Sequence, residues 1–320
     1  MPGVIPVAAD LLDLPSLRER IHALPVSHVF YSTWLRQPSE AENVAVNGAM
    51  MRNLFAALQR SHMLQHVSLV TGTKHYLGPF ESYGQTVAET PFREDNPRLP
   101  GENFYYTQED ILFEAADRMG FHWNVFRPHT MIGYTLGNAM NMGVTLAVYA
   151  TICRETGRPF VFPGSIFQWN ALTDVTDATM LAREMEWAAT HAPAHDQALN
   201  AVNGDIFRWR WLWGKLAEWF GVTPQGPLPG EKQPLEAQQA ELSTAWTRIA
   251  QDHDLAVKQV DKLASWWHTD ADLGREVECV NDMTRSRLLG FTEYRSTLAS
   301  FVNLFERLER DRILPRRSTR

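Results

Sequence analysis

Short apolar runs alternate with segments of helical periodicity in the amino-terminal part of the chain, and this alternation constrains the fold more than any other feature. Three runs rich in β-branched and aromatic residues span 26–31, 66–70 and 123–126. Helical patterns begin between them, near Ser39 and Thr107. Because strands that alternate with helices form parallel sheets covered by helices, we expect a doubly wound α/β fold with a mostly parallel sheet.

The rest of the chain can be divided in the same way. An apolar run at 4–9 ends at Asp10 and precedes a helical pattern at 14–21, so a strand is expected there too. A long connection at 72–101 has no clear period and is expected to be a functional loop. Further segments are expected to be helical at 138–154, 177–189 and 209–220, extended at 159–162 and 198–202, turn-rich at 224–234 and helix-rich at 235–314.

Composition excludes several classes of protein. The 320 residues carry 30 basic and 37 acidic side chains, a net charge of −7 that offers no electrostatic footprint for nucleic acid. Two cysteines, Cys153 and Cys279, cannot build a disulfide framework, and no Cys/His spacing resembles a zinc site, so no metal is expected. No apolar run is long enough for a membrane span, and no signal peptide is evident. We therefore expect a cytoplasmic enzyme or binding protein that does not associate with membranes.

Two segments carry side chains with suitable chemistry for reduction. Lys74 follows the apolar run at 66–70, and Tyr105 lies in the segment 103–106. In open α/β sheets ligands bind past the carboxyl ends of strands, where Lys74 is expected. An ammonium beside a phenol favours the phenolate, and a phenol can donate a proton to a substrate oxygen that gains negative charge. The alternative, a surface lysine and a half-buried ring, is common in any chain of this length.

Several segments together resemble the progesterone 5β-reductase and iridoid-synthase-like (PRISE) branch of the short-chain dehydrogenases/reductases. The matching segments are 30–34, 40–43, 71–81, 103–106, 127–128, 203–209, 265–268 and 282–287. In this family the lysine comes from a Thr-Gly-x-Lys-His-Tyr segment and not from Tyr-x-x-x-Lys. The chain agrees, since Glu109 stands four residues after Tyr105. The resemblance implies that Lys74 and Tyr105 are catalytic and that NADPH, or alternatively NADH, delivers hydride to the activated C=C of a small apolar enone.

The resemblance also implies a set of binding residues. Those expected at the cofactor are Asp10, Leu11, Thr33, Val70, Lys74, Tyr105, Thr130, Met131 and Asn138. Those expected at the substrate are Trp34, Phe80 and Thr130. Ordinary packing remains an alternative for Trp34 and Phe80, and helix capping for Asp10. The family commonly has glycine where this chain has His129, which puts the local backbone in question.

The sequence departs from the family at its amino-terminal end, where no glycine-rich strand–turn–helix is found. In the sheet order 3-2-1-4-5-6, the absence of the first two strands leaves the run at 4–9 without neighbours and exposes the edge of the run at 26–31. A translation start placed too late is the favoured explanation, and a shortened product is the alternative.

On this view residues 1–135 form a truncated Rossmann-type dinucleotide-binding part. Residues 136–320 complete the sheet at about 198–204 and supply a helix-rich substrate-binding part. A homodimer is possible. An NAD-dependent sugar-nucleotide epimerase or dehydratase, and a cofactor-free non-catalytic protein, remain alternatives.

Overall fold

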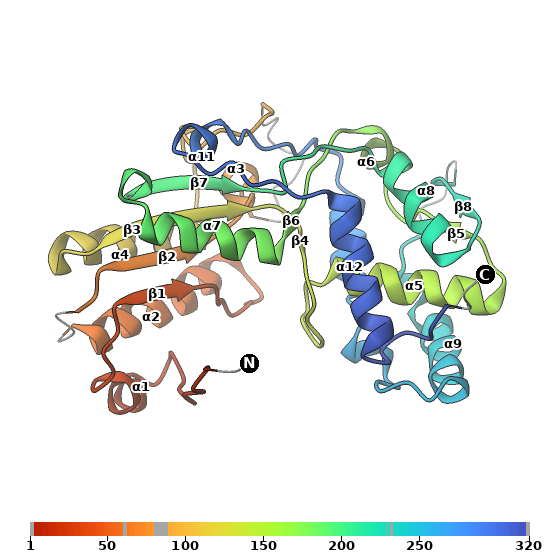
Figure 1. The fold of residues 1–320 in the computed structure, drawn as a ribbon, viewed down its shortest axis with the longest axis horizontal. Coiled ribbons are helices and arrows are strands. Elements are labelled where there is room, and N and C mark those ends of the chain that lie inside the picture. Colours follow the sequence, from red (N-terminus) through yellow and green to blue (C-terminus); the bar gives the residue numbers. More distant parts are fainter. Residues whose placement is uncertain (1–2, 60–62, 80–88, 229, 231–232, 318–320) are drawn as a thin grey trace.

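A parallel sheet of four strands forms one side of the molecule (Figure 1). A computed structural model describes residues 3–59, 63–79, 89–228, 230 and 233–317. The strands are, in their order across the sheet, β1 (His28–Tyr31), β2 (His66–Val70), β3 (His122–Pro128) and β7 (Gln197–Ala201). Their register pairs His28 with His66 and His66 with His122, so β1, β2 and β3 start level with one another. Residues that follow these strands consequently meet at one edge.

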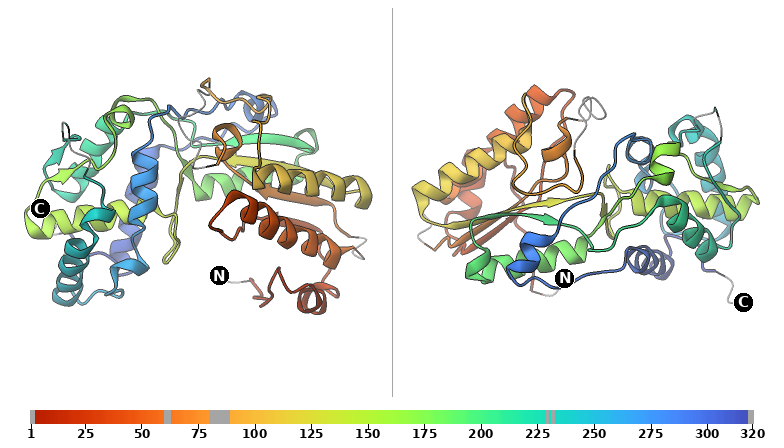
Figure 2. Two further views of the ribbon diagram at one scale, coloured as in Figure 1. Left: turned by 180° about the vertical axis from the view of Figure 1, so that it is seen from behind. Right: turned by 90° about the horizontal axis from the view of Figure 1, so that it is seen from above.

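Helices cover both faces of the sheet, as Figure 2 shows. On one face, Val67 and Leu69 of β2 belong to a buried cluster with α2 (Glu40–Leu58) and α4 (Phe104–Met119). On the other face, Phe126 of β3 packs with α7 (Ala178–Thr190). Successive side chains of a strand point to opposite faces, so both faces of a sheet covered in this way must be apolar. The predicted doubly wound α/β fold is confirmed.

The helices on the sheet begin at polar capping residues. Ser39 and Glu42 form a reciprocal capping box at the start of α2, in which the Ser39 side chain accepts from the Glu42 amide and Glu42 accepts from the Ser39 amide. Asn103 caps α4 by accepting from the amide of Tyr105 at 3.0 Å. Because of this cap, α4 starts three residues before the predicted Thr107 and includes Tyr105 in its first turn.

The second part of the molecule is a helical bundle around α5 (Met142–Thr156), which is buried from Met142 to Cys153. The helices α8 (Trp209–Phe220), α9 (Gln239–Asp252), α10 (Trp266–Leu273) and α12 (Thr297–Arg310) contact α5. Two short parallel pairs add to it, β4 (Met131–Ile132) with β6 (Thr176–Asp177) and β5 (Phe160–Val161) with β8 (Pro224–Gln225). The remaining α-helices are α1 (Leu14–Ile21), α3 (Lys74–Leu77), α6 (Ile166–Asn170) and α11 (Thr284–Leu288). Among the described residues, no helix combines the length and apolar character that crossing a membrane requires.

Some predicted elements are wrong. Residues 4–9 form no strand and are exposed, with Ile5 85% accessible, because no strand of the described chain lies beside them to share a ladder of hydrogen bonds. The predicted exposed edge is present, since β1 pairs on one side with β2 and Phe30 is 49% exposed. The connection at 72–101 contains α3, and α5 begins at Met142 instead of residue 138, after the capping residue Asn141. Part of the turn-rich stretch forms β8.

The core of the bundle provides a test of packing. Trp213 is fully buried, stacks on Phe160 with ring centres 3.8 Å apart, and donates from Nε1 to the Phe160 carbonyl at 2.8 Å. Trp213→Ala should lower the free energy of unfolding by about 3–5 kcal/mol, because it leaves a cavity and an unpaired carbonyl. Trp211→Ala, on the same helix but 49% exposed, is the control and should change it by less than about 1 kcal/mol. Equal effects in chemical denaturation would contradict this description of the core.

A row of imidazoles at the amino-terminal edge of the sheet provides a second test. His66 is 1% exposed, lies with its ring centre 6.1 Å from that of His28 and 5.4 Å from that of His195, and contacts Asn124 at 2.8 Å. Burial, with a smaller contribution from the neighbouring imidazoles, lowers the pKa of His66 from 6.5 to about 4. The folded protein therefore resists protonation of this ring.

The free energy of unfolding should fall as the pH decreases from about 6.5 to about 4. Between these values the unfolded chain binds a proton at His66 that the folded chain does not. His66→Gln should reduce the loss of Tm between pH 7 and pH 5, whereas the same change at the exposed His22 should not. An identical loss of Tm in wild type and His66→Gln would show that His66 does not contribute.

Candidate active site

The turn after β2 brings the two predicted catalytic residues together. The amides of Thr71 and Thr73 continue the pairing with β3 by donating to the carbonyls of Phe126 and Pro128 at 2.8 and 3.1 Å. Gly72 lies between them, and a Cβ there would be 3.2 Å from the Pro128 oxygen and 3.4 Å from the Tyr105 hydroxyl. The hydroxyl of Tyr105 therefore lies against bare backbone at the carboxyl edge of the sheet.

Lys74 begins α3 and is held from two directions. Its Nζ lies 2.5 Å from Oε2 of Glu40, and its carbonyl accepts from Nδ2 of Asn103 at 3.1 Å. The other carboxylate oxygen of Glu40 accepts from the amide of Phe104 at 2.8 Å. Lys74 is only 6% exposed, so its ammonium is fixed by a buried ion pair and not by solvent.

The electrostatic state of Tyr105 differs from the sequence-based prediction. The ammonium of Lys74 lies 6.0 Å from the centre of the Tyr105 ring, and its direct ion-pair partner is Glu40. Burial raises the pKa of Tyr105 well above its usual range, and the negative charge of Glu40 raises it further. Burial and the charge of Glu40 therefore act against the predicted phenolate. Tyr105 is a neutral phenol, which is the form that can donate a hydrogen bond.

A cavity of about 400 Å³ opens beside Lys74. Its lining consists of Trp34, Arg36, Gln37, Pro38, Glu40, Asn43 and Lys74. Trp34 stacks on Phe104 with ring centres 5.3 Å apart, so it both packs against α4 and forms a wall of the cavity. Phe80, the other predicted aromatic substrate residue, lies outside the described residues. The volume is in the range of small-molecule sites.

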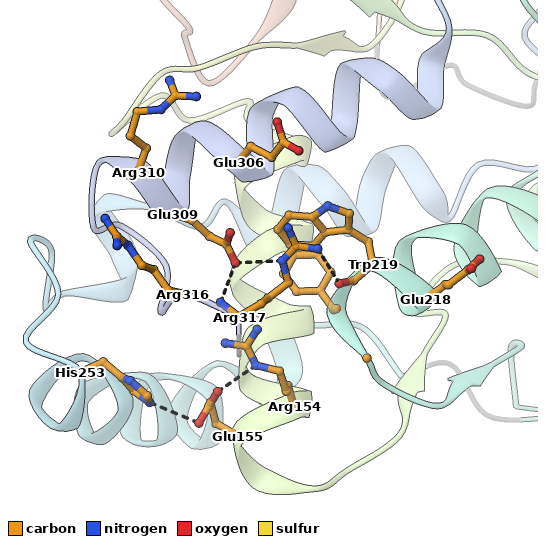
Figure 3. A pocket seen from close by; sticks show the side chains of 12 residues that line it. Arg154, Glu155, Glu218, Trp219, His253, Glu306, Glu309, Arg310, Arg316 and Arg317 are labelled. Atoms are coloured by element: carbon orange, nitrogen blue, oxygen red, sulfur yellow. Dashed lines mark hydrogen bonds and ion pairs between the residues drawn. The ribbon is translucent and has the colours of Figure 1, made fainter. Parts of the chain in front are cut away.

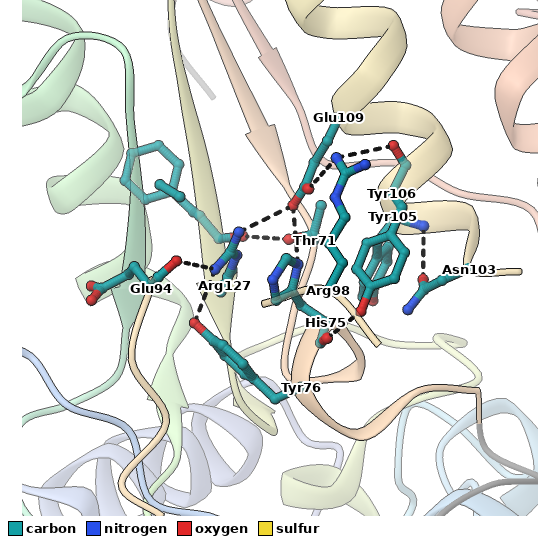
Figure 4. A network of polar contacts seen from close by, with 12 residues as sticks. Thr71, His75, Tyr76, Glu94, Arg98, Asn103, Tyr105, Tyr106, Glu109 and Arg127 are labelled. Carbon is teal, nitrogen blue, oxygen red and sulfur yellow. Dashed lines mark hydrogen bonds and ion pairs between the residues drawn. The ribbon is translucent and has the colours of Figure 1, made fainter. Parts of the chain in front are cut away.

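A network of polar contacts centred on Glu109 lies close to Tyr105 (Figure 4). Glu109 is 2% exposed and contacts His75 at 3.3 Å, Arg98 at 2.9 Å and Arg127 at 3.5 Å. Burial alone would raise the pKa of Glu109, but the contact with His75 and the charge of Arg127 lower it, so the carboxylate is ionised. The side chain four residues after Tyr105 thus anchors α4 to α3 and β3.

The other predicted cofactor residues fall into two groups. Thr33 follows β1 and is exposed, Val70 ends β2, Thr130 follows β3, and Met131 begins β4, so these four lie at the ends of successive strands. Asp10, Leu11 and Asn138 form the second group, and their role at the cofactor stays a prediction. Their hydrogen bonds are local or go to α2: Asp10 accepts from Leu12, Asn138 accepts from Met140, and the Leu11 carbonyl accepts from Asn53.

His129 stands where the resemblance implies a glycine, and its side chain makes contacts that a glycine could not make. The ring is buried, with Nδ1 2.9 Å from Asp174 and Nε2 3.0 Å from Nη1 of Arg275. Arg275 also contacts Asp272 at 3.0 Å, and Asp272 accepts from the Thr130 hydroxyl at 2.5 Å. Asp272 and Arg275 were not predicted from the sequence, and neither were Arg36 and the bridging role of Glu40. No local pattern marks them, because their partners are far away along the chain.

A second, larger cavity lies among the helices of the bundle (Figure 3). It measures about 1000 Å³ and is lined by charged side chains that pair with one another, such as Arg317 with Glu309 at 3.1 Å and His253 with Glu155 at 3.3 Å. None of the predicted site residues lines it. Within the described ranges no cluster of His, Cys, Asp or Glu is arranged to hold a metal ion.

The Glu109 network should contribute strongly to stability. Glu109→Ala removes the carboxylate and leaves the buried Arg127 unpaired, which should lower the free energy of unfolding by about 3–5 kcal/mol. Asp110→Ala is a matched control on the next residue, since Asp110 pairs at 2.7 Å with the same Arg98 but is 64% exposed. It should cost less than about 1 kcal/mol in guanidinium denaturation. Similar losses in the two variants would exclude a structural role for the buried network.

Comparisons with known proteins show the family of the chain. A family model described as a PRISE-like Rossmann-fold domain matches residues 10–315. The chain is 37% identical over 312 residues to the 3-oxo-Delta(4,5)-steroid 5-beta-reductase of Arabidopsis thaliana, and 35% identical over 312 residues to the (S)-8-oxocitronellyl enol synthase ISY1 of Nepeta cataria. Each alignment covers 97% of this chain and 80% of the relative.

Solved structures share the fold. RMD from Pseudomonas aeruginosa complexed with NADPH superposes with a TM-score of 0.66 at 14% identity, over 96% of this chain and 90% of that one. WbmG from Bordetella bronchiseptica in complex with NAD and UDP gives 0.63 at 12% identity, over 98% and 82%. The sequence matches, unlike these structural ones, extend to the level of a family, and they identify the chain as an oxidoreductase, as predicted. The chain belongs to the family defined by the PRISE-like Rossmann-fold domain.

Proposed function

We propose that this chain reduces the activated C=C of an enone, with NADPH as the hydride donor, Tyr105 as the group that acts on the substrate oxygen and Lys74 as its charged neighbour. The observation that carries the proposal is the neutral Tyr105 hydroxyl held against the bare backbone of Gly72, next to the buried Lys74. The family relatives, one named a reductase and another an enol synthase, support it.

The phenol of Tyr105 suits an oxygen that gains negative charge. Addition of hydride to the β-carbon of an enone moves charge to the carbonyl oxygen, giving an enolate. A raised pKa keeps the proton on Tyr105 until that moment, so the hydroxyl can donate its hydrogen bond or proton to the enolate oxygen. A fixed donor in a site shielded from water stabilises such charge without reorganisation.

Lys74 would act mainly by position. Its ammonium has three donors, and the ion pair with Glu40 fixes where they are. Because Glu40 also accepts from the first turn of α4, the same carboxylate sets the distance between Lys74 and the helix that carries Tyr105. Lys74 and Tyr105 would therefore keep a fixed distance from each other beside the substrate and the cofactor.

The residues at this edge fit the nicotinamide end of a dinucleotide. Parallel strands end there, and Gly72 keeps the backbone open beside Tyr105. Thr33, Val70, Lys74, Tyr105, Thr130 and Met131 would hold it, and Trp34 and Thr130 would contact the substrate. When bound, NADPH supplies the hydride. The resemblance also implies Asp10, Leu11 and Asn138 at the cofactor, and the step proposed for Tyr105 does not depend on them.

Removal of either side chain should reduce enone reduction. Tyr105→Phe loses the donor to the enolate oxygen, and Lys74→Met loses the fixed charge, so each should lower kcat/KM for a small enone by roughly a hundredfold or more. The rate is measured as enone-dependent oxidation of NADPH, with NADH in parallel.

Tyr294→Phe is the control for the same chemical change at an exposed ring, and it should retain the wild-type rate. Wild-type rates in both site variants, or no oxidation of NADPH or NADH with any enone by the wild type, would reject the proposed function.

A further inference from the structure

Arg36 lines the same cavity as Lys74 but has a different electrostatic setting. It lies in the segment between β1 and α2, and its Cζ is 4.0 Å from the centre of the Trp267 ring of α10. The contact therefore joins the sheet side of the cavity to the helical part. A guanidinium that stacks on an aromatic ring uses its face, and its five N–H groups remain in the plane of the group.

The carboxylate in the cavity lining is already occupied. Glu40 has Oε2 at 2.5 Å from Lys74 and Oε1 at 2.8 Å from the Phe104 amide. Arg36 is exposed, and none of the hydrogen bonds or ion pairs found among the described residues involves its guanidinium. The charges of Lys74 and Glu40 offset each other, so among the described lining residues Arg36 is the charge that this ion pair does not balance.

Such a group recognises an oxyanion. The planar fork of a guanidinium matches a carboxylate with two parallel hydrogen bonds, and a site that offers this fork favours a charged ligand over its neutral ester. The small volume of about 400 Å³ limits the ligand to a small molecule. Tyr105 is not among the lining residues, but Lys74 is, and its Nζ lies 6.0 Å from the centre of the Tyr105 ring. The wall formed by Trp34 suits the apolar chain of such a molecule.

We infer that the preferred substrate is a small enone that also carries a carboxylate, which Arg36 binds while the enone oxygen lies at Tyr105. The inference rests on the proposed function for the position of the enone. It makes Arg36 the residue that determines specificity, and it departs from the expectation of a small apolar enone. Trp267 holds the guanidinium in place by stacking.

Binding without turnover tests the inference. The probe is an acyclic enone with a carboxylate three methylene groups from the C=C, and the matched ligand is the methyl ester of the same acid. Dissociation constants are measured by calorimetry with and without NADP⁺, which has no hydride to give. Wild type should bind the acid about tenfold more tightly than the ester, as expected for one charge-assisted pair of hydrogen bonds.

Two variants distinguish a specific effect of Arg36 from a general effect of removing one positive charge. Arg36→Leu should abolish the preference for the acid, whereas Arg248→Leu, which removes an exposed arginine of α9, should keep it. Equal constants for acid and ester in wild type, no measurable binding of the acid, or an unchanged preference in Arg36→Leu would each overturn the inference.

Two further measurements separate a role of Arg36 at the substrate from a role at the cofactor. The dissociation constant of NADP⁺ should be the same in wild type and Arg36→Leu, and weaker binding in the variant would overturn the inference by assigning Arg36 to a cofactor phosphate. Oxidation of NADPH with the neutral ester reports on the reductase activity itself. Reduction of acid and ester with equal kcat/KM would overturn the preference while leaving the proposed function intact.

Discussion

The carboxylate of Glu40 is the interaction on which the arrangement of the site depends. It lies at the first turn of α2, where the helix dipole favours negative charge, and it binds both the ammonium of Lys74 and the first free amide of α4. Three helices that start at the same edge of the sheet are thereby tied through one side chain. The same charge raises the pKa of Tyr105, so the group that positions the lysine also keeps the tyrosine protonated.

The residue four positions after Tyr105 is Glu109, and it makes structural contacts where a lysine would place a positive charge. A lysine there would lie one turn from Tyr105 along α4. Glu109 takes that place and contacts His75, Arg98 and Arg127. The positive charge near Tyr105 then has to come from another element, and α3 supplies it through Lys74. The short helix exists because the turn after β2 continues the hydrogen bonding of the sheet up to Thr73.

Local sequence patterns predicted the elements whose stability is largely local or whose two faces are both apolar. The strand at 66–70 and the helix at 209–220 are examples, and the positions of Lys74 and Tyr105 followed from the family segments. The run at 4–9 was predicted as a strand and is not one, because a strand depends on a neighbour that local pattern cannot supply. The raised pKa of Tyr105 could not be predicted from local sequence either, since its causes are burial in the fold and the charge of Glu40, which lies far from Tyr105 in sequence.

Polar contacts after the end of β3 connect this edge of the sheet to the helical part. In place of a residue without a side chain, His129 fills the space after Pro128 and connects Asp174 to Arg275. Arg275 and Thr130 both contact Asp272 at the end of α10, the helix whose Trp267 stacks on Arg36. One helix thus accepts a hydrogen bond from the side chain of Thr130, beside the proposed cofactor position, and five residues earlier stacks on the residue that we assign to the substrate carboxylate. A movement of α10 would therefore alter both contacts at once.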